Sequence, residues 1–564
     1  MLSALFVGQG PGPQAEQIAE RLDDRFRLLT GGSRTALPRQ QTLRAMIDWS
    51  YDLLPESERV LLRRLSVFAG GWTLEGAETV CQGLGIDDYN VLDPLAQLVN
   101  KSLVVVDADI MPVGYDSAET RYRLLETVRQ YAREKLSETG DGMAVRDLHL
   151  QYFLSLAEQA ELELIGPRVM EWLKRLYQEL DNLRTALEWS LKQDVQIGMK
   201  LASALMRYWV DDGLIGEGIE WLSQLLQQPA SSTRNAARAK ALTALGFLNG
   251  CFTEQAKSLP LAEEGLTIYR ALGDQRGAAL ALNVLGWGLH FQGNHTAGRP
   301  LAIESLALYR ALGDQPGIAD ALGLLGFFVY NEDFIEARAY LEESLTLCRE
   351  LGYVIGIIDQ LTWLGQLARR MGDYASAHSW LTQALKILRN LDSKYFLLSY
   401  IIGLLGEVSL QQGDYETARV YLEESLSLDR ENGFRDENWY LVRLGYIALR
   451  QGNQAQASSL LIKAQQGFKE SGRKIGVVYA LEGLASLTVL QEQPERAVRL
   501  FAWADATRET IGDYRPPVEQ ADVDRDLATI HAQLDEATFV AAQEAGRAMT
   551  MDEAIALPLE STHD

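Results

Sequence analysis

The sequence predicts a predominantly all-α protein: an α-helical solenoid of about seven helix-turn-helix units, preceded by a small α+β domain. The first observation is a Leu-Gly pair that recurs every 39 to 41 residues, and the second is an Ala 10 to 12 residues after each Gly. Two small residues at fixed offsets let two helices approach closely, and a period near 40 is typical of helical repeat arrays. The glycines are Gly246, Gly286, Gly326, Gly365, Gly406 and Gly445, and the alanines are Ala256, Ala297, Ala337, Ala377, Ala418 and Ala457.

Each unit also carries signals for the two ends of its second helix. A polar turn after the first helix contains an Asp or Asn that can cap the next helix, as in Asn294, Asp333, Asp373, Asp414 and Asn453. A second Gly follows, where a left-handed C-terminal cap is expected, at Gly273, Gly313, Gly352, Gly433, Gly472 and Gly512, with Asp392 in this place once. Pro260 and Pro300 predict that the second helices of the first two units start or kink there.

This pattern resembles the tetratricopeptide repeat, whose small residues occupy the same helix-packing positions. The resemblance is strongest in GQLARRMGDYASAHSWLTQAL and GEVSLQQGDYETARVYLEESL, and it covers residues 236–515 as a superhelix of seven units. The seventh unit, EGLASL with Ala497, is the weakest match. Because the period exceeds the usual one of about 34 residues, each helix is expected to be longer by about half a turn to a turn.

Composition limits the class of protein. The 564 residues carry a net charge of -24 and are 47% hydrophobic, which is enough for several cores and unfavourable for a general affinity for polyanions. No apolar run approaches the ~20 residues of a membrane helix, and no basic secretory start is present. Cys81, Cys251 and Cys348 lie far apart, without metal or disulfide spacing, so they are expected to be small buried side chains of a cytoplasmic protein with no membrane contact.

A different module precedes the repeats. LRAMIDWSYDLL and ERVLLRRLSVFAGG have the spacing of amphipathic helices, VLDPLAQLVNKSLVVV of a helix leading into a strand, and RYRLLETVRQYAREKL of a strand leading into a helix. Helices followed by a two-stranded wing predict a winged-helix-like domain at 21–145. It lies between an N-terminal remnant, 1–20, and a helical connector with a degenerate repeat, 146–235. Two capping helices are expected in 516–564.

One basic stretch stands out in this acidic chain. Two interpretations remain open for it: solvated or domain-contact arginines, which we favour, and a polyanion site. Its members are Arg21, Arg25, Arg27, Arg34, Arg39, Arg44, Arg59, Arg63 and Arg64.

Several long blocks give a more specific resemblance. RLDDRFRLLTGGSRTALPRQQTLRAMIDWSYDLL, LLRRLSVFAGGWTLEGAETVC, LVNKSLVVV and RYRLLETVRQYA are similar to the segment that follows the nucleotide-binding domain in bacterial STAND-class signal-transduction ATPases, many of them transcriptional regulators. YQELDNLRTALEWSL resembles their connector, and LFAWADATRETIGDYRPP resembles the end of their repeat arrays. The similarity covers about residues 16 to 558.

The motor motifs of that class are absent from the sequence. There is no G-x-x-x-x-G-K-[ST] loop, and in GQGPGP two prolines remove backbone donors, so no nucleotide or other cofactor is expected. Where relatives carry a Met-His-Asp-like triplet, Leu124, Leu125 and Glu126 align here. The chain is therefore expected to be either a fragment of a longer protein or a natural chain without its ATPase domain. No second DNA-reading domain is expected after the repeats.

Catalysis is not predicted. None of the six histidines has the spacing of a metal site, and no nucleophile elbow occurs. Acidic pairs such as Glu342-Glu343 and Glu423-Glu424 recur at one repeat position and are expected to be solvated helix faces. We predict no catalytic, cofactor or metal residues and no enzyme activity.

Aromatic residues give the sharpest indication of a binding site. The position after each repeat Gly is expected to face the concave groove, and aromatic or polar residues lie there and one turn later. Packing between first helices is one interpretation, and a groove for a peptide or a small effector is the other. The candidate groove residues are Phe247, Trp287, His290, Phe327, Tyr330, Gln366, Arg369, Glu407 and Tyr446.

Three functions are compatible with these observations. The favoured one is a non-enzymatic regulatory or sensor module whose repeats bind a protein, a peptide or a small effector and, in a complete ATPase, report that binding through the winged-helix domain. The second is a transcriptional regulator that binds DNA through its winged helix, although the acidic balance makes nucleic acid an unfavourable partner. The third is a stand-alone scaffold for protein-protein interaction.

Overall fold

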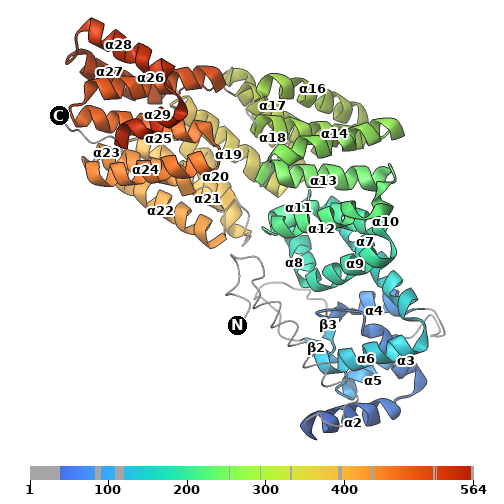
Figure 1. The fold of residues 1–564 in the computed structure, drawn as a ribbon. Helices are drawn as coiled ribbons and strands as arrows, with labels where there is room; N and C mark the ends of the chain where they lie inside the picture. Colours follow the sequence, from blue (N-terminus) through green and yellow to red (C-terminus); the bar gives the residue numbers. More distant parts are fainter. Residues whose placement is uncertain are drawn as a thin grey trace. The chain divides into compact units, whose positions relative to one another are not determined.

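The computed structural model describes residues 38–82, 91–107, 120–252, 255–291, 294–330, 333–391, 397–432, 437–511, 513, 515 and 517–559. Within these ranges the chain is almost entirely helical, with helices α2 to α29 and one small sheet (Figure 1). It forms two compact units. The first comprises Met1–Leu164, Met170–Tyr208 and Gly216–Ala244, and the second comprises Ile165–Val169, Trp209–Ile215 and Leu245–Asp564.

The first unit begins with the winged-helix domain that the sequence predicts. Its helices enclose a core around Leu61, Phe68 and Trp72. The sheet is antiparallel with the order β1-β3-β2, and Tyr122 lies opposite both Trp72 and Val106. The two strands that the sequence predicts are β2 and β3, which pair antiparallel. The third strand, β1, was not predicted, because it has only two residues and no sequence periodicity. The elements are α2 (Pro38–Asp52), α3 (Glu56–Leu65), β1 (Trp72–Thr73), α4 (Leu74–Cys81), α5 (Leu92–Asn100), β2 (Val105–Asp107), β3 (Arg121–Arg123) and α6 (Glu126–Thr139).

Most of the connector belongs to the same unit, and a buried amide joins it to the winged-helix domain. Asn182 on α9 accepts a hydrogen bond from the Ala69 backbone N–H (2.6 Å) and donates to the Gly71 carbonyl (2.8 Å). Its amide also donates to Glu179, which pairs with Arg121 on β3. The connector consists of α7 (Gly142–Glu163), α8 (Val169–Gln178), α9 (Leu180–Gln193), α10 (Val195–Ala204), α11 (Met206–Asp211), α12 (Ile215–Gln227) and the 3-10 turn η1 (Pro229–Ser232).

The repeats form seven successive helix pairs, as the sequence predicts. In the second to seventh pairs the two helices pack antiparallel, and each second helix packs on the first helix of the next pair. In the first pair the Ser258 hydroxyl donates to the Gly246 carbonyl at 2.8 Å. The first helices are α13 (Ala236–Phe252), α15 (Gln275–Phe291), α17 (Gln315–Val329), α19 (Val354–Arg370), α21 (Leu397–Gln411), α23 (Glu437–Arg450) and α25 (Lys474–Leu490). The second helices are α14 (Gln255–Leu272), α16 (His295–Leu312), α18 (Phe334–Leu351), α20 (Tyr374–Asn390), α22 (Tyr415–Asn432), α24 (Gln454–Glu470) and α26 (Pro494–Ile511).

In most repeats the predicted small residues lie where the two helices of a pair pack closely. A Cβ on Gly365 would lie 2.6 Å from Cγ of Leu381 on the paired helix, so only glycine permits this approach. The alanines from Ala337 onward are fully buried. The expected position was wrong at Ala297, which is exposed; Gly298 packs instead, with Phe328 only 2.3 Å from the place of its absent Cβ. The side chain of Ala256 lies outside the described residues.

The predicted caps are present. Gly273, Gly313, Gly352 and Gly472 have positive φ, while Gly433, Gly512 and Asp392 lie outside the described residues. Asn294, Asp333, Asp373, Asp414 and Asn453 each accept a hydrogen bond from a backbone N–H in the first turn of the second helix.

The expected role of two prolines as helix starts was wrong. Helices α14 and α16 begin five residues before Pro260 and Pro300 and continue through them. A proline in the second turn removes only one intrahelical hydrogen bond, which the flanking turns tolerate here.

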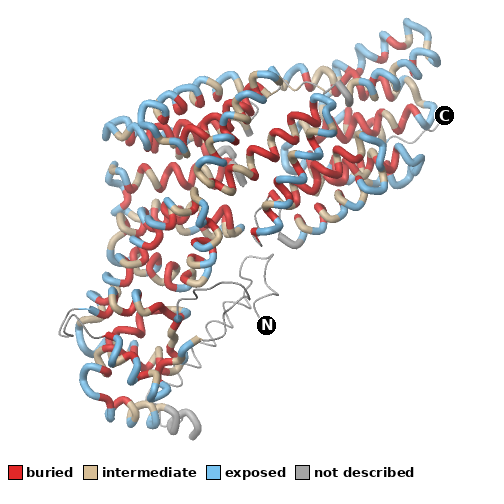
Figure 2. Tube along the Cα trace, turned by 180° about the vertical axis from the view of Figure 1, so that it is seen from behind, coloured by how far each residue is buried: buried red, intermediate tan, exposed pale blue. Residues whose placement is uncertain are grey.

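The repeat stack is curved, with the first helices on its inner side. First helices of adjacent repeats pack against one another, for example α15 on α17 and α23 on α25, more closely than successive second helices do. We call the surface formed by the first helices the inner face and that formed by the second helices the outer face. Figure 2 shows buried residues where the helices of a pair meet and exposed residues along the outer turns.

Three helices follow the repeats instead of the two expected. They are α27 (Pro517–His531), α28 (Glu536–Ala548) and the short α29 (Met551–Ala556), which ends in the 3-10 turn η2 (Leu557–Leu559). Helix α29 starts at a capping box in which Thr550 and Glu553 bond to each other's backbone N–H.

Candidate functional site

The predicted groove residues lie on first helices, one or two per repeat, except that Tyr330 is the C-terminal cap of α17. Phe247 is on α13, Trp287 and His290 on α15, and the rest follow on α17 to α23. Arg369 is 4% exposed and Phe327 is 8% exposed, whereas the other candidates keep an intermediate exposure. The structure therefore brings these residues to one face, but two of them belong largely to the interior.

The aromatic candidates form part of a continuous row along the inner face. The ring centroids of Trp287 and Phe327 are 4.8 Å apart and those of Phe327 and Trp363 4.2 Å, both edge to face. The tilted rings of Trp363 and Tyr400 are 5.7 Å apart. Such pairs add about 0.5–1.5 kcal/mol beyond area burial. We call these four residues the aromatic row. Phe327 acts as core within it, and the half-buried rings beside it leave part of their surface on the inner face.

His290 borders the aromatic row. Its ring lies against Trp287 and Phe327 and is stacked on His295, with centroids 5.1 Å apart. Burial, with a smaller contribution from His295, lowers the pKa of His290 well below its ordinary value. The ring is therefore neutral at pH 7 and extends the apolar surface.

Trp363 and Tyr400 were not among the sequence candidates. Trp363 lies three residues before Gln366, and Tyr400 lies seven residues before Glu407. These spacings, one and two helical turns, place both residues on the same helix face as the candidates. Searching one and two turns toward the N-terminus of each first helix would have found them.

Beyond the aromatic row the inner face becomes polar. The Tyr400 hydroxyl donates to Oε1 of Gln366 at 2.8 Å. The Arg370 guanidinium lies over the ring of Tyr330, 4.9 Å from its centroid. This junction joins aromatic surface to positive charge on α17, α19 and α21.

A buried charge network continues from this junction along α19 to α25. Glu407 lies between two arginines, with Oε2 3.0 Å from Nη1 of Arg369 and Oε1 2.9 Å from Nε of Arg443. Burial alone would raise the pKa of Glu407, but the two guanidinium groups outweigh it and hold the pKa below its ordinary value. Glu407 is therefore ionised and committed to internal pairing.

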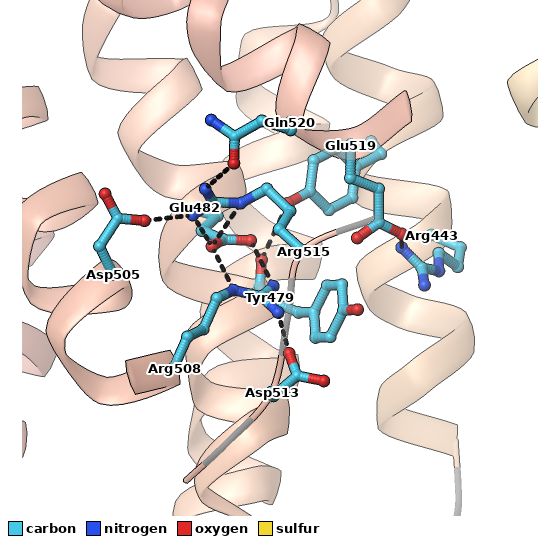
Figure 3. Close-up of polar contacts among 10 residues, drawn as sticks. Arg443, Tyr479, Glu482, Asp505, Arg508, Asp513, Arg515, Glu519 and Gln520 are labelled. Atoms are coloured by element: carbon cyan, nitrogen blue, oxygen red, sulfur yellow. Dashed lines mark hydrogen bonds and ion pairs between the residues drawn. The ribbon is translucent and has the colours of Figure 1, made fainter. Parts of the chain in front are cut away.

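Glu482 on α25 is the second centre of the network (Figure 3). Both of its oxygens accept from Arg508, at 2.9 Å each, and Arg515 donates to Oε1 at 2.6 Å. Arg508 also pairs with Asp513 and lies 4.6 Å from the ring centroid of Tyr479. Glu482 and both arginines have side chains at most 6% exposed.

Three of the predicted groove residues make internal contacts in or beside this network. Arg369 and Glu407 pair internally, and the Tyr446 hydroxyl donates to the Tyr479 carbonyl at 3.0 Å. These groups hold adjacent repeats together in the structure described. Sequence reasoning missed Arg443 and Glu482 because no repeat offset marks a contact between adjacent repeats or between the last repeat and the segment that follows it.

The outer face carries a separate cavity of about 320 Å³ between α22 and α24. Its floor includes Leu441, Leu444 and Leu460, and its rim includes Arg419 and Lys463. None of the predicted groove residues lines it. It lies where consecutive second helices diverge over α23.

The arginines of the winged-helix domain serve internal contacts. Arg64 is 1% exposed and donates to the Cys81 carbonyl at 2.7 Å, and Arg59 donates to the Tyr51 carbonyl. Arg63 donates to the Tyr51 hydroxyl, and Arg44 pairs with Glu134. The expected domain contacts are therefore present for these four, while the side chains of Arg21, Arg25, Arg27, Arg34 and Arg39 lie outside the described residues.

Other predictions concern the chemistry of isolated residues. Cys81 and Cys348 are buried free thiols, as expected, and the side chain of Cys251 lies outside the described residues. Leu124 is buried, and Leu125 precedes the first turn of α6. Across the part of the chain that the structure describes, no cluster of His, Cys, Asp and Glu could hold a metal ion, and no helix is sufficiently long and apolar to cross a membrane.

Comparison with known families defines the class of the chain. The winged helix-turn-helix domain family matches residues 54–137, and the tetratricopeptide repeat family matches residues 326–390 and 358–431. The chain thus combines a winged helix-turn-helix domain with a tetratricopeptide superhelix.

The chain is similar to proteins named as regulators, and it spans less than a third of their length. Proteins of Mycobacterium bovis and Mycobacterium tuberculosis named as HTH-type transcriptional regulators are 37% identical over 278 residues, which is 48% of this chain and 30% of theirs. The crystal structure of a Signal Transduction ATPase with Numerous Domains (STAND) from Pyrococcus horikoshii, with a tetratricopeptide repeat sensor, shares the fold. Its TM-score is 0.51 at 16% identity, covering 92% of this chain and 72% of that one.

Proposed function

We propose that this chain is a non-enzymatic sensor module whose inner face binds a peptide segment of a protein partner or a small amphipathic effector. The observation that carries the proposal is the aromatic row, which spans four consecutive first helices and leaves half-buried rings on one surface. Aromatic anchors supply most of the binding energy at many interfaces because they bury large areas with little conformational entropy.

The contacts between the winged-helix domain and the connector provide a way for binding at the repeats to move the winged-helix domain. The buried Asn182 and the Arg121–Glu179 pair attach β3 and the turn at Gly71 to the connector helices. A displacement of the connector would therefore carry the winged-helix domain with it. In a chain that also contains an ATPase domain, this joint would transmit a signal from the repeats.

DNA binding through the winged helix is the second candidate, favoured by the names of the mycobacterial relatives. The exposed positions of α5 include Asp93, Gln97 and Asn100 and no arginine, and the four arginines described above make internal contacts. Since cationic contacts to phosphate dominate such affinity, we expect no DNA binding near physiological salt. A gel shift that survives competitor DNA would favour the second candidate.

A peptide-selection experiment tests the first candidate. Random displayed peptides are selected on the full chain, and the affinity of the selected peptides is measured for wild type, Trp287→Ala and Ile335→Ala. We expect Trp287→Ala to weaken binding by about 1–3 kcal/mol, while Ile335→Ala, which alters an 81% exposed side chain on the outer face, changes nothing. Equal affinities for all three proteins, or a large loss of stability in Trp287→Ala without loss of affinity, would contradict the proposal.

A further inference from the structure

Helix α27 lies on the inner face of the last repeats instead of continuing the stack. Glu519 lies 3.7 Å from Nη1 of Arg443, and Asp522 pairs with Nη2 of Arg450 at 2.5 Å, both on α23. The Ser486 hydroxyl on α25 donates to Asp526 at 2.5 Å. Three acidic side chains of α27 therefore reach the first helices of the two preceding repeats.

The pattern of α27 matches this surface along its length. Its acids lie at intervals of three and four residues, and its apolar residues Val523, Leu527 and Ile530 follow the same helical stripe. Val523 and Ile530 are buried. The opposite side of the helix includes the exposed Asp524 and Arg525. This part of the inner face is thus complementary, in shape and in charge, to an acidic amphipathic helix.

The cap of the superhelix is provided by another helix. Helix α28 packs along α26, and a Cβ on Gly546 would lie 2.4 Å from the Arg499 carbonyl oxygen, so the two backbones are in close contact. Helix α29 packs on α26 as well. Helix α27 also contacts α26 and α25, but less extensively than α28 contacts α26, so α28 covers most of the last repeat.

We propose that the inner face of α23 and α25 is a docking site for an acidic amphipathic helix of a partner protein, and that α27 occupies it in cis until the partner displaces it. Arg443 and Arg450 pair with the acidic side chains, and Val523 and Ile530 of the apolar stripe pack in the core of the last repeats. This inference extends the proposed function by naming the charge of the partner. Binding of peptides at the aromatic row does not depend on it.

A competition experiment tests the proposal. The probe is a fluorescein-labelled peptide with the sequence of residues 517–531, and the proteins are the full wild-type chain and its Glu519→Gln/Asp522→Asn/Asp526→Asn variant. A tethered helix acts at an effective concentration in the millimolar range, so it should exclude the probe from wild type. We expect the probe to bind the variant at least about tenfold more tightly than wild type, with an affinity that falls as salt rises.

Matched arginine variants locate the site. Added to the triple variant, Arg443→Gln with Arg450→Gln should remove most probe binding, whereas Arg310→Gln, an exposed arginine of the outer face, should not. A folded triple variant that fails to bind the probe would overturn the proposal. So would a stable wild-type dimer by light scattering that dissociates in the triple variant, since α27 would then be exchanged between copies.

Hydrogen exchange on wild type provides a test that does not depend on a variant. We expect the amides of α27 to exchange at least about tenfold faster than those of α25 and α28, because α27 leaves the surface without unfolding its neighbours. Equal protection of α27, α25 and α28 would mean that α27 is a permanent part of the cap. Loss of peptide binding in Trp287→Ala would remain unaffected by that result, so failure here is distinct from failure of the proposed function.

Discussion

The buried charge network and the outer face of the superhelix each contain an Arg–Glu pair, in different surroundings. On the outer face Arg310 pairs with Glu343 at 2.9 Å, and both side chains are half exposed. In the buried network Arg508 of α26 pairs with Glu482 of α25 at the same distance, and both are 5% exposed. The distance is equal, so the difference in burial decides the energetic role of each pair.

Solvent explains why the two pairs differ. Exposed ion pairs contribute about 0–1 kcal/mol because water and salt screen them. A buried charge whose partner is removed loses the interaction that compensated for its dehydration, and the loss is about 3–5 kcal/mol. The outer pairs connecting successive second helices are therefore dispensable one at a time, while the inner network fixes the geometry on which a binding surface depends.

The largest effect is expected at Glu482. Glu482→Ala leaves Arg508 and Arg515 buried without their shared carboxylate, and we expect a loss of about 3–5 kcal/mol in the free energy of unfolding. Urea unfolding followed by circular dichroism measures it. A loss below about 1 kcal/mol would mean that water replaces the carboxylate and that the inner network resembles the outer pairs.

An intermediate effect is expected between the two faces, at Gly365. An added Cβ would meet Leu381 at 2.6 Å, so Gly365→Ala must push the first and second helices of that repeat apart. Overpacking of this kind costs about 1–3 kcal/mol. Gly216→Ala, where an added Cβ meets nothing within 4 Å, is the control; if the two variants unfold alike, helix contact does not depend on the repeat glycine.

The free energy of unfolding should also depend on pH through the buried carboxylates of the network. Burial alone would raise the pKa of Glu482, but Arg508 and Arg515 lower it below its ordinary value of 4.5. A carboxylate of this kind contributes stability above its unfolded pKa and loses it as the pH falls through the folded pKa. Asp513 acts in the opposite sense, because burial raises its pKa. We expect the free energy of unfolding to fall below about pH 4.5, less steeply in Glu482→Gln than in wild type; parallel pH profiles would contradict the assignment.

The smallest effect is expected on the outer face. Glu343→Ala removes a half-exposed pair with Arg310, and we expect less than about 0.5 kcal/mol. The same urea measurement serves as the matched control for Glu482→Ala. A loss comparable to that at Glu482 would show that the outer pairs act as a cooperative network along the stack.

The sequence predicted the scaffold better than the site. The glycines and buried alanines report contacts within one repeat, which a fixed offset can reveal, and they located all seven helix pairs. The exception at Ala297 shows the limit, because Gly298 occupies the packing position when counted from the cap at Asn294.

The site depends on contacts between repeats, for which no offset is diagnostic. Arg443 joins Glu407 of one repeat to Glu519 beyond the last repeat. Glu482 pairs with Arg508 on α26 of its own repeat and with Arg515 after that helix. Their pairing follows from the curvature of the stack and from the return of α27, neither of which has a local sequence signal. Trp363 and Tyr400 could have been predicted from the sequence, because helical spacing alone relates them to Gln366 and Glu407.

The most direct test of the central claim is a hydrogen-exchange footprint of a selected peptide bound to the full chain. If the inner face is the binding surface, the peptide slows amide exchange in α15, α17 and α19, which carry Trp287, Phe327 and Trp363. The second helices α16, α18 and α20 should remain unchanged. A footprint confined to second helices, or to α22 and α24 around the outer cavity, would contradict the account.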